Sequence, residues 1–127
     1  MRKAIFILSV LFIVTLSSCI KKCDEWHEGT KCNSEIRSKY YGTYSGNLTG
    51  VGSTHTDVSE YPGQPNRVYI GVMSATLTDE TNFTIPIQVI NISGVAYTAN
   101  GAGYFSTNGI LYNYDLNNQP YSFVGFK

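Results

Sequence analysis

His55 and Asp57 are the residues whose types and spacing come nearest to a catalytic unit. Two positions apart on a strand, their side chains would share a face, so the carboxylate could orient the imidazole as a base. Ser53 or Ser59 on that face would supply a nucleophile. The other interpretation is a solvated polar strand, and it is the one that we adopt. We therefore expect no catalytic residue and no enzyme, and keep a hydrolase centred on His55 as the last alternative.

The remaining candidates for chemistry are few. Asp79-Glu80 lies in an expected turn, where acidic residues are common for backbone reasons. Gly101-Ala-Gly103 opens no helix as a phosphate loop would, and we interpret it as a bend or bulge. Cys23, Cys32 and His27 offer three metal ligands, whereas a structural zinc site has four. We expect no metal and no cofactor.

The N-terminal segment predicts export. Arg2-Lys3 precedes an apolar run, residues 4–16, that is shorter than the roughly 20 residues needed to span a bilayer as a helix. A basic start followed by a short apolar run is typical of a signal peptide. The next residues, Leu16-Ser17-Ser18-Cys19, resemble the lipobox of bacterial lipoprotein precursors. The resemblance implies removal of residues 1–18, a diacylglyceryl group on the Cys19 thiol and an acylated new amino terminus.

The chain has three cysteines, and lipidation of Cys19 would account for the odd one. Cys23 and Cys32 could then form a disulfide worth about 2–3 kcal/mol by chain entropy, in a compartment that keeps it oxidised. With Trp26 and Gly29 between them, they resemble the last disulfide loop of an EGF-like module. The other four cysteines of such a module are absent, so its calcium site is not expected. We interpret residues 19–38 as a neck that holds the following domain off the membrane.

Residues 39–127 predict an all-β domain. Tyrosine, threonine, valine and isoleucine are frequent, and no sustained helical period is present beyond a brief turn near residues 34–39. Asn108-Gly109 predicts a type I′ hairpin turn. We expect seven or eight strands in a small antiparallel barrel or sandwich. The expected strands include residues 67–77, 82–89, 95–99, 104–107, 110–116 and 121–126.

Alternation predicts which side chains face the core. Tyr112 and Tyr114 share an inward face with Ile110 and Leu116. Upstream, alternate apolar residues predict a second half-buried strand, which Pro86 places at an edge or a bulge because proline cannot donate to the ladder. Those alternating residues are Phe83, Ile85, Ile87 and Val89.

The opening of the β domain carries a further resemblance. The segment from Arg37 to Gly46, after the loop ending at Cys32, is similar to small lipoproteins common in Bacteroidetes. Gly42-Thr43-Tyr44 and the C-terminal meander resemble calycin- or lipocalin-like barrels. That resemblance implies a closed meander and a carrier of a small apolar ligand, but transfers no binding residue.

Charge and tyrosine content limit the classes of partner that we expect. Removal of residues 1–18 takes Arg2 and Lys3 from nine basic residues and leaves seven, against nine acidic ones. Nucleic acid needs a positive surface, so we do not expect it as a partner. Tyr41, Tyr61 and Tyr69 are the candidates for outward contacts, because a tyrosine ring offers apolar area and a polar tip.

These observations predict an envelope lipoprotein held on a membrane, most simply the outer membrane, by its N-terminal lipid. The sequence leaves open which face the domain occupies. Its β domain would bind a partner without catalysing a reaction: an envelope protein, a glycan or a small ligand. A lipocalin-like carrier is the second interpretation, and a cavity of several hundred cubic ångströms would favour it.

Overall fold

The computed structural model describes residues 23, 25–28, 32 and 34–127, and in this part the chain is all-β. The predicted signal peptide, residues 1–18, and Cys19 lie outside the described residues. The strands of the β domain are joined in sequence and preceded by one 3₁₀ helix. The elements are β1 (His27–Glu28), β2 (Ser34–Glu35), η1 (Ile36–Tyr40), β3 (Gly42–Leu48), β4 (Gly52–Glu60), β5 (Arg67–Ile70), β6 (Met73–Leu77), β7 (Asn82–Ile92), β8 (Val95–Phe105), β9 (Gly109–Leu116) and β10 (Gln119–Phe126).

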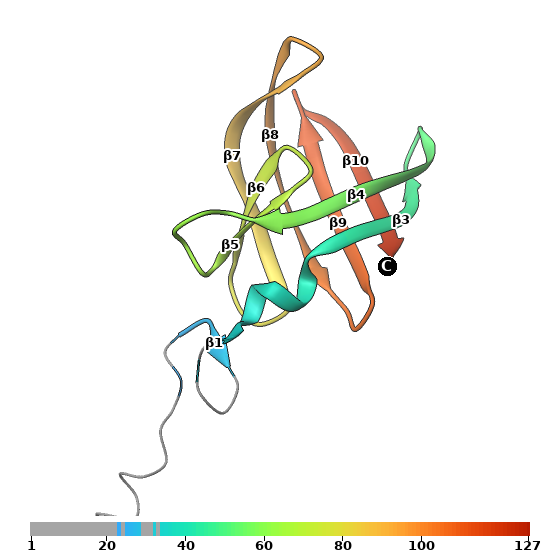
Figure 1. The fold of residues 1–127 in the computed structure, drawn as a ribbon. Coiled ribbons are helices and arrows are strands. Elements are labelled where there is room, and N and C mark those ends of the chain that lie inside the picture. Colours follow the sequence, from blue (N-terminus) through green and yellow to red (C-terminus); the bar gives the residue numbers. More distant parts are fainter. Residues whose placement is uncertain (1–22, 24, 29–31, 33) are drawn as a thin grey trace, which may run out of the picture.

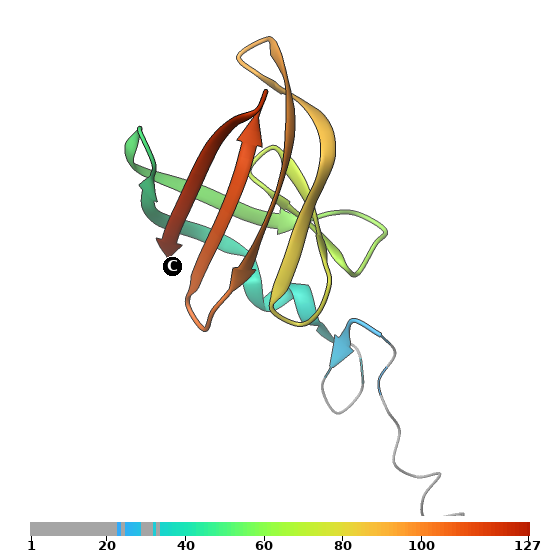
Figure 2. The ribbon, with the colours of Figure 1, turned by 180° about the vertical axis from the view of Figure 1, so that it is seen from behind.

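Strands β3 to β10 form a closed barrel rather than a sandwich (Figure 1). Each strand pairs antiparallel with the next, and β10 returns to pair with β3, from Phe123 opposite Leu48 to Phe126 opposite Ser45. Figure 2 shows the C-terminal strands from behind, side by side in chain order. The predicted antiparallel meander is confirmed, and closure pairs the first and last strands, β3 and β10, with each other.

Two of the hairpin turns carry the backbone that a type I′ turn requires. Asn117 and Asn118 both have positive φ, at 50° and 67°, and so do Ser93 and Gly94, at 52° and 82°. The predicted type I′ turn at Asn108-Gly109 is wrong, because neither residue has positive φ. Gly109 instead begins β9, where an added Cβ would lie 3.0 Å from the Phe126 ring. Its role is close packing.

Two predicted strand boundaries are also wrong. The strand expected over residues 67–77 is two strands, β5 and β6, because Gly71 (φ 60°) and Val72 form a turn between them. The strand expected to end at residue 99 continues through Gly101 to the end of β8. A Cβ on Gly101 would lie 2.2 Å from the carbonyl oxygen of Asn113 on β9. Glycine at this position permits close strand approach and ends nothing.

A bulge in β7 reverses the expected facing of its second half. The register with β8 shifts between Ile85 and Gln88, on either side of Pro86. Ile87 and Val89 were expected inside but are 77% and 70% exposed. The predicted bulge at Pro86 is thus confirmed, and its physical effect is to move the following apolar alternation by one residue.

One end of the barrel, which we call the base, is filled by aromatic rings. Tyr40 of η1 stacks on Phe105 with ring centroids 4.0 Å apart, and Phe83 lies 5.0 Å from Phe105. The Tyr44 hydroxyl donates a 2.9 Å hydrogen bond to the carbonyl of Tyr40, while the Tyr40 hydroxyl donates to the carbonyl of Glu80. The 3₁₀ helix therefore closes this end of the barrel.

Arg37 fixes η1 to the loop that follows β4. Its side chain is 2% exposed, and its Nη1 lies 2.6 Å from the carbonyl oxygens of Tyr61, Gln64 and Arg67, which share its two N–H donors. The guanidinium also pairs with carboxylates of Glu35 and Glu60, at 2.9 and 3.2 Å. A buried arginine needs such partners, because an unpaired buried charge is strongly destabilising. The base therefore consists of Arg37, Tyr40, Tyr44, Phe83 and Phe105.

The neck joins the barrel at the base. The predicted Cys23–Cys32 disulfide is present. Trp26 packs against the core, and its carbonyl oxygen accepts a 2.9 Å hydrogen bond from the Ile36 amide, which continues the short β1–β2 pair into η1. Among the residues described, no helix has the length and apolar character to cross a membrane.

Candidate functional site

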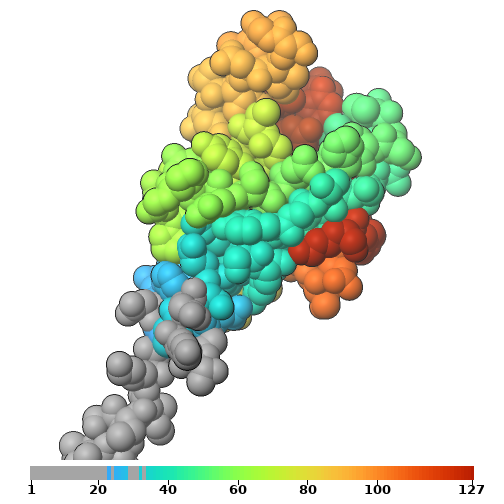
Figure 3. Space-filling view, viewed as in Figure 1, coloured from blue at the N-terminus to red at the C-terminus, as the bar shows by residue number. Residues whose placement is uncertain are grey.

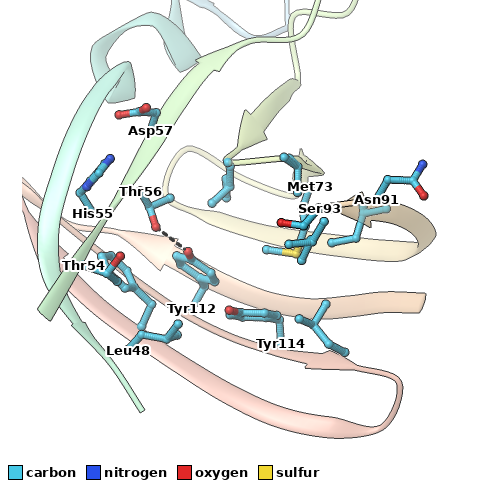
Figure 4. A pocket seen from close by; sticks show the side chains of 17 residues that line it. Leu48, Thr54, His55, Thr56, Asp57, Met73, Asn91, Ser93, Tyr112 and Tyr114 are labelled. Atoms are coloured by element: carbon cyan, nitrogen blue, oxygen red, sulfur yellow. Dashed lines mark hydrogen bonds between the residues drawn. The ribbon is translucent and has the colours of Figure 1, made fainter. Parts of the chain in front are cut away.

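The end of the barrel away from η1, which we call the mouth, holds a cavity of about 570 Å³ (Figure 4). Its lining comes from the ends of β3, β9 and β10, from β4, and from the β5–β6 and β7–β8 hairpin turns. This volume lies within the range of small-molecule sites, roughly 300–1,000 Å³. The mouth cavity is therefore the candidate site.

The mouth is open because two of the eight strands are short. β4 pairs with β5 only over Val58–Glu60, and β6 pairs with β7 only at Thr76 and Leu77. The rest of β4 and β7 has no backbone ladder across this gap, and the longer β7–β8 hairpin extends beyond the barrel body at the top of Figure 3. The gap between β4 and β7 leaves the space that forms the cavity.

Part of this gap is crossed by a side chain instead of the backbone. The Gln88 amide accepts from the backbone N–H of Ser74 through Oε1 and donates to the Ser74 carbonyl through Nε2, both at 2.8 Å. Gln88 lies two residues after Pro86, beyond the end of the β6–β7 ladder, which pairs only Thr76 and Leu77 of β6. Its amide thus satisfies the two backbone groups of β6 that a continuous β7 ladder would have paired.

The inner wall of the mouth cavity is apolar with a few hydroxyl groups. Thr56 of β4 is directed toward Tyr112 of β9, and Thr54 and Tyr114 lie beside them (Figure 4). The Tyr112 hydroxyl and Thr56 Oγ1 are 2.8 Å apart. Apolar residues make up much of the rest of the wall: Leu48, Ile70, Met73, Ile90, Leu116 and Phe123.

The tyrosines of the mouth are neutral at physiological pH, and their surroundings raise the pKa of each phenol above its ordinary value. Burial raises the pKa of Tyr112 to about 12, against a smaller lowering by the hydrogen bond between Tyr112 and Thr56. Burial also raises the pKa of Tyr114, and the neighbouring Tyr121 adds to that increase. Both phenols are therefore neutral hydrogen-bonding groups at physiological pH.

Two glycines of β8 make room for these tyrosines. Gly101 lies opposite Tyr114 and Gly103 lies opposite Tyr112 in the β8–β9 register. A Cβ on Gly103 would lie 2.5 Å from the Cβ of Tyr112. The sequence interpretation placed these tyrosines on the core face but did not predict the cavity. The signal that could have indicated it is the pairing of small residues 101–103 with the large tyrosines of residues 112–114 in the adjacent strand.

The three tyrosines predicted for outward contacts lie outside the mouth cavity. Tyr61 and Tyr69 pack together with ring centroids 5.0 Å apart, and the Arg67 guanidinium lies 4.2 Å above the Tyr61 ring. Tyr41 follows η1 at the base, and its carbonyl oxygen accepts a 3.2 Å hydrogen bond from Lys127. All three are half-buried. Within the described residues no ring contact joins Tyr41 to the other two.

The His55 and Asp57 side chains lie on the other side of β4 from Tyr112 (Figure 4). The Asp57 carboxylate accepts a 2.6 Å hydrogen bond from the Thr43 hydroxyl, and the Ser53 hydroxyl is directed to Asn47. In the described part of the chain, no hydrogen bond or ion pair joins His55 to either residue. The arrangement assembles no base–nucleophile pair.

Among the described residues, none joins His27 in a group of metal ligands. Its Nδ1 lies 3.2 Å from the carbonyl oxygen of Glu25, and both thiols of the loop are in the disulfide. The described residues contain no group of three or more His, Cys, Asp or Glu side chains placed to hold a metal ion.

Comparison with known proteins finds no family model, no curated protein and no solved structure that matches this chain. Its function must therefore be inferred from the geometry of the barrel.

Proposed function

We propose that this protein is a lipid-anchored envelope lipoprotein whose barrel binds a small, largely apolar molecule in its mouth. The observation that carries the proposal is the mouth cavity of about 570 Å³, lined by apolar side chains and a few neutral hydroxyl groups. Small-molecule sites have this composition: an apolar wall with a small number of placed polar groups. Of the two interpretations offered by the sequence, this cavity favours the carrier over the contact module.

A probe of neutral, apolar character tests the binding. The processed protein is held in phospholipid nanodiscs, and the fluorescence of N-phenyl-1-naphthylamine is measured above that of empty nanodiscs. We expect saturable binding of about one probe per chain. Leu116→Trp, which fills the mouth cavity, should abolish it, because Leu116 lines the cavity.

The matched control is Val124→Trp, on the outer face of β10, where the side chain is exposed. It adds the same indole outside the cavity and should leave probe binding unchanged. Fluorescence that equals that of empty nanodiscs would refute the carrier. Equal loss in both variants would show that binding does not depend on the mouth cavity.

The membrane anchor rests on the lipobox resemblance around Cys19. Two or more acyl chains hold a protein stably on a bilayer, whereas one of myristoyl length is marginal. Mass spectrometry of the mature amino terminus should find acylated Cys19 as the first residue, and Cys19→Ala should remain unprocessed. An unmodified Cys19 in a chain that partitions entirely into the aqueous phase on detergent extraction would overturn the anchor. Protease shaving of intact cells then reports which face the barrel occupies.

A further inference from the structure

A partly buried pair of hydroxyl groups lies in the wall of the mouth cavity. Thr56 Oγ1 and the Tyr112 hydroxyl, 2.8 Å apart, join β4 to β9, which are not neighbours in the barrel. Tyr112 is only 4% exposed. Each hydroxyl has one hydrogen, and their mutual bond uses one of the two, whichever oxygen donates. One O–H donor is therefore left over, and no other described residue accepts a hydrogen bond from the pair.

The wall around this pair has no fixed positive charge. Among the described residues that line the cavity there is no lysine or arginine, and His55 and Asp57 belong to the outer face of β4. Tyr112 and Tyr114 are neutral at pH 7, where a tyrosine phenol is protonated even in water, and burial raises the pKa of each phenol further. A carboxylate or phosphate placed here would lose its hydration without gaining a cationic partner, which is costly.

We infer that the mouth cavity selects uncharged ligands with an oxygen atom that accepts a hydrogen bond from the Thr56–Tyr112 pair. The inference rests on the proposed ligand binding and adds its chemical class. The apolar body of such a ligand packs against Met73, Ile90 and Leu116, which line the same cavity. A hydroxyl, carbonyl or ether oxygen fits the spare donor, whereas an anionic head group does not.

Three compounds that share one ring system separate the contributions of the apolar body, the neutral oxygen and the anionic group. They are naphthalene, 2-naphthol and 2-naphthoate. Their binding is measured at pH 7 by equilibrium dialysis against the processed protein in nanodiscs, with empty nanodiscs as the reference. We expect 2-naphthol to bind at least about tenfold more tightly than 2-naphthoate, since an unpaired buried charge costs more than the 1.4 kcal/mol that a factor of ten represents.

The decisive variant removes both hydroxyls, Thr56→Val with Tyr112→Phe. Replacing both partners of a hydrogen bond by apolar groups of similar shape is nearly neutral for folding. The double variant should weaken 2-naphthol binding about threefold to tenfold and leave naphthalene binding unchanged. Each single variant keeps one hydroxyl hydrogen and should lose less. Tyr104→Phe, which removes a phenol from the exposed outer face of β8, is the matched control and should change nothing.

The outcomes distinguish this inference from the proposed function. If none of the three compounds binds above the reference, the carrier itself fails. If all three bind equally and the double variant changes nothing, the carrier stands and the selection of neutral oxygen ligands is overturned. Tighter binding of 2-naphthoate than of 2-naphthol would also overturn it.

Discussion

The two ends of this barrel are built from the same residue types with opposite results. At the base, Tyr40 and Phe105 stack closely and η1 covers the opening. At the mouth, Tyr112 and Tyr114 border a cavity, because the β5–β6 hairpin is too short to bring the wall together. A high content of tyrosine therefore does not itself predict a binding surface. What differs is whether an additional element fills the barrel end.

The largest expected effect comes from removing a ring of the base. Phe105→Ala should lower the free energy of unfolding by about 3–5 kcal/mol, because the side chain is fully buried and packs against three aromatic rings. Leu116→Ala at the mouth should cost less than about 2 kcal/mol, since Leu116 borders open space. Urea unfolding followed by circular dichroism measures both; equal costs would mean that the mouth is packed as tightly as the base.

The next effect tests the hydrogen bonds of Arg37 at the base. Arg37→Met should cost on the order of 3 kcal/mol, because three carbonyl oxygens lose their buried donor. Arg67→Met is the matched control. Arg67 as a residue is half-buried. Its guanidinium donates to the Ser74 hydroxyl, and its buried Nε has no hydrogen-bond partner among the described residues, so a loss of about 1 kcal/mol is expected. A larger loss of unfolding free energy in Arg67→Met than in Arg37→Met would show that the contacts by which Arg37 fixes η1 to the loop after β4 are not the critical ones.

A smaller effect is expected where the closed and open parts of the barrel meet. Gln88→Ala removes two hydrogen bonds to the backbone of Ser74 and should cost about 1–2 kcal/mol. Hydrogen exchange at the Ser74 amide should accelerate with it. Gln119→Ala, at an exposed position that begins β10, should leave both measurements unchanged. An unaltered exchange rate in Gln88→Ala would show that the amide bridge does not hold the gap.

The last effect appears only at high pH, as a loss of stability. Burial, followed by the nearby Tyr40 phenol, raises the pKa of Tyr44 at the base to about 12. A group whose pKa is higher in the folded than in the unfolded state contributes stability that is full below the unfolded value, near 10, and is lost as the pH rises toward 12. Urea midpoints should fall between pH 9.5 and 11.5. Tyr44→Phe at the base and Tyr112→Phe at the mouth should each reduce the decrease of the urea midpoint with pH. Tyr104→Phe, at an exposed position, should leave that decrease unchanged.

Local pattern was enough to predict part of this molecule. Alternation along residues 110–116 correctly placed Tyr112 and Tyr114 inside. Proline chemistry left an edge or a bulge open at Pro86, and the structure has the bulge. Both follow from neighbouring residues alone. The pairing of Cys23 with Cys32 could be predicted because it was the one pairing left after Cys19 was assigned to a lipid. The structure contains this disulfide.

The rest depended on contacts between distant residues. Arg37 had no visible role because the carbonyls that it binds lie 24 to 30 residues later in the chain. The mouth cavity was missed for a similar reason. The turn at Gly71-Val72 shortens the β5–β6 hairpin, and the resulting gap emerges only when β4 and β7 are placed on either side of it.

The attachment of β1 and β2 beside η1 gives the molecule a direction. The chain enters at the filled end of the barrel, and the β7–β8 hairpin lies at the opposite end (Figures 1 and 2). If Cys19 carries the proposed lipid, the tether joins the barrel at its base, at the opposite end from the mouth cavity. Under the proposed carrier function, the attachment point would then leave the mouth unobstructed by the chain that leads to the anchor.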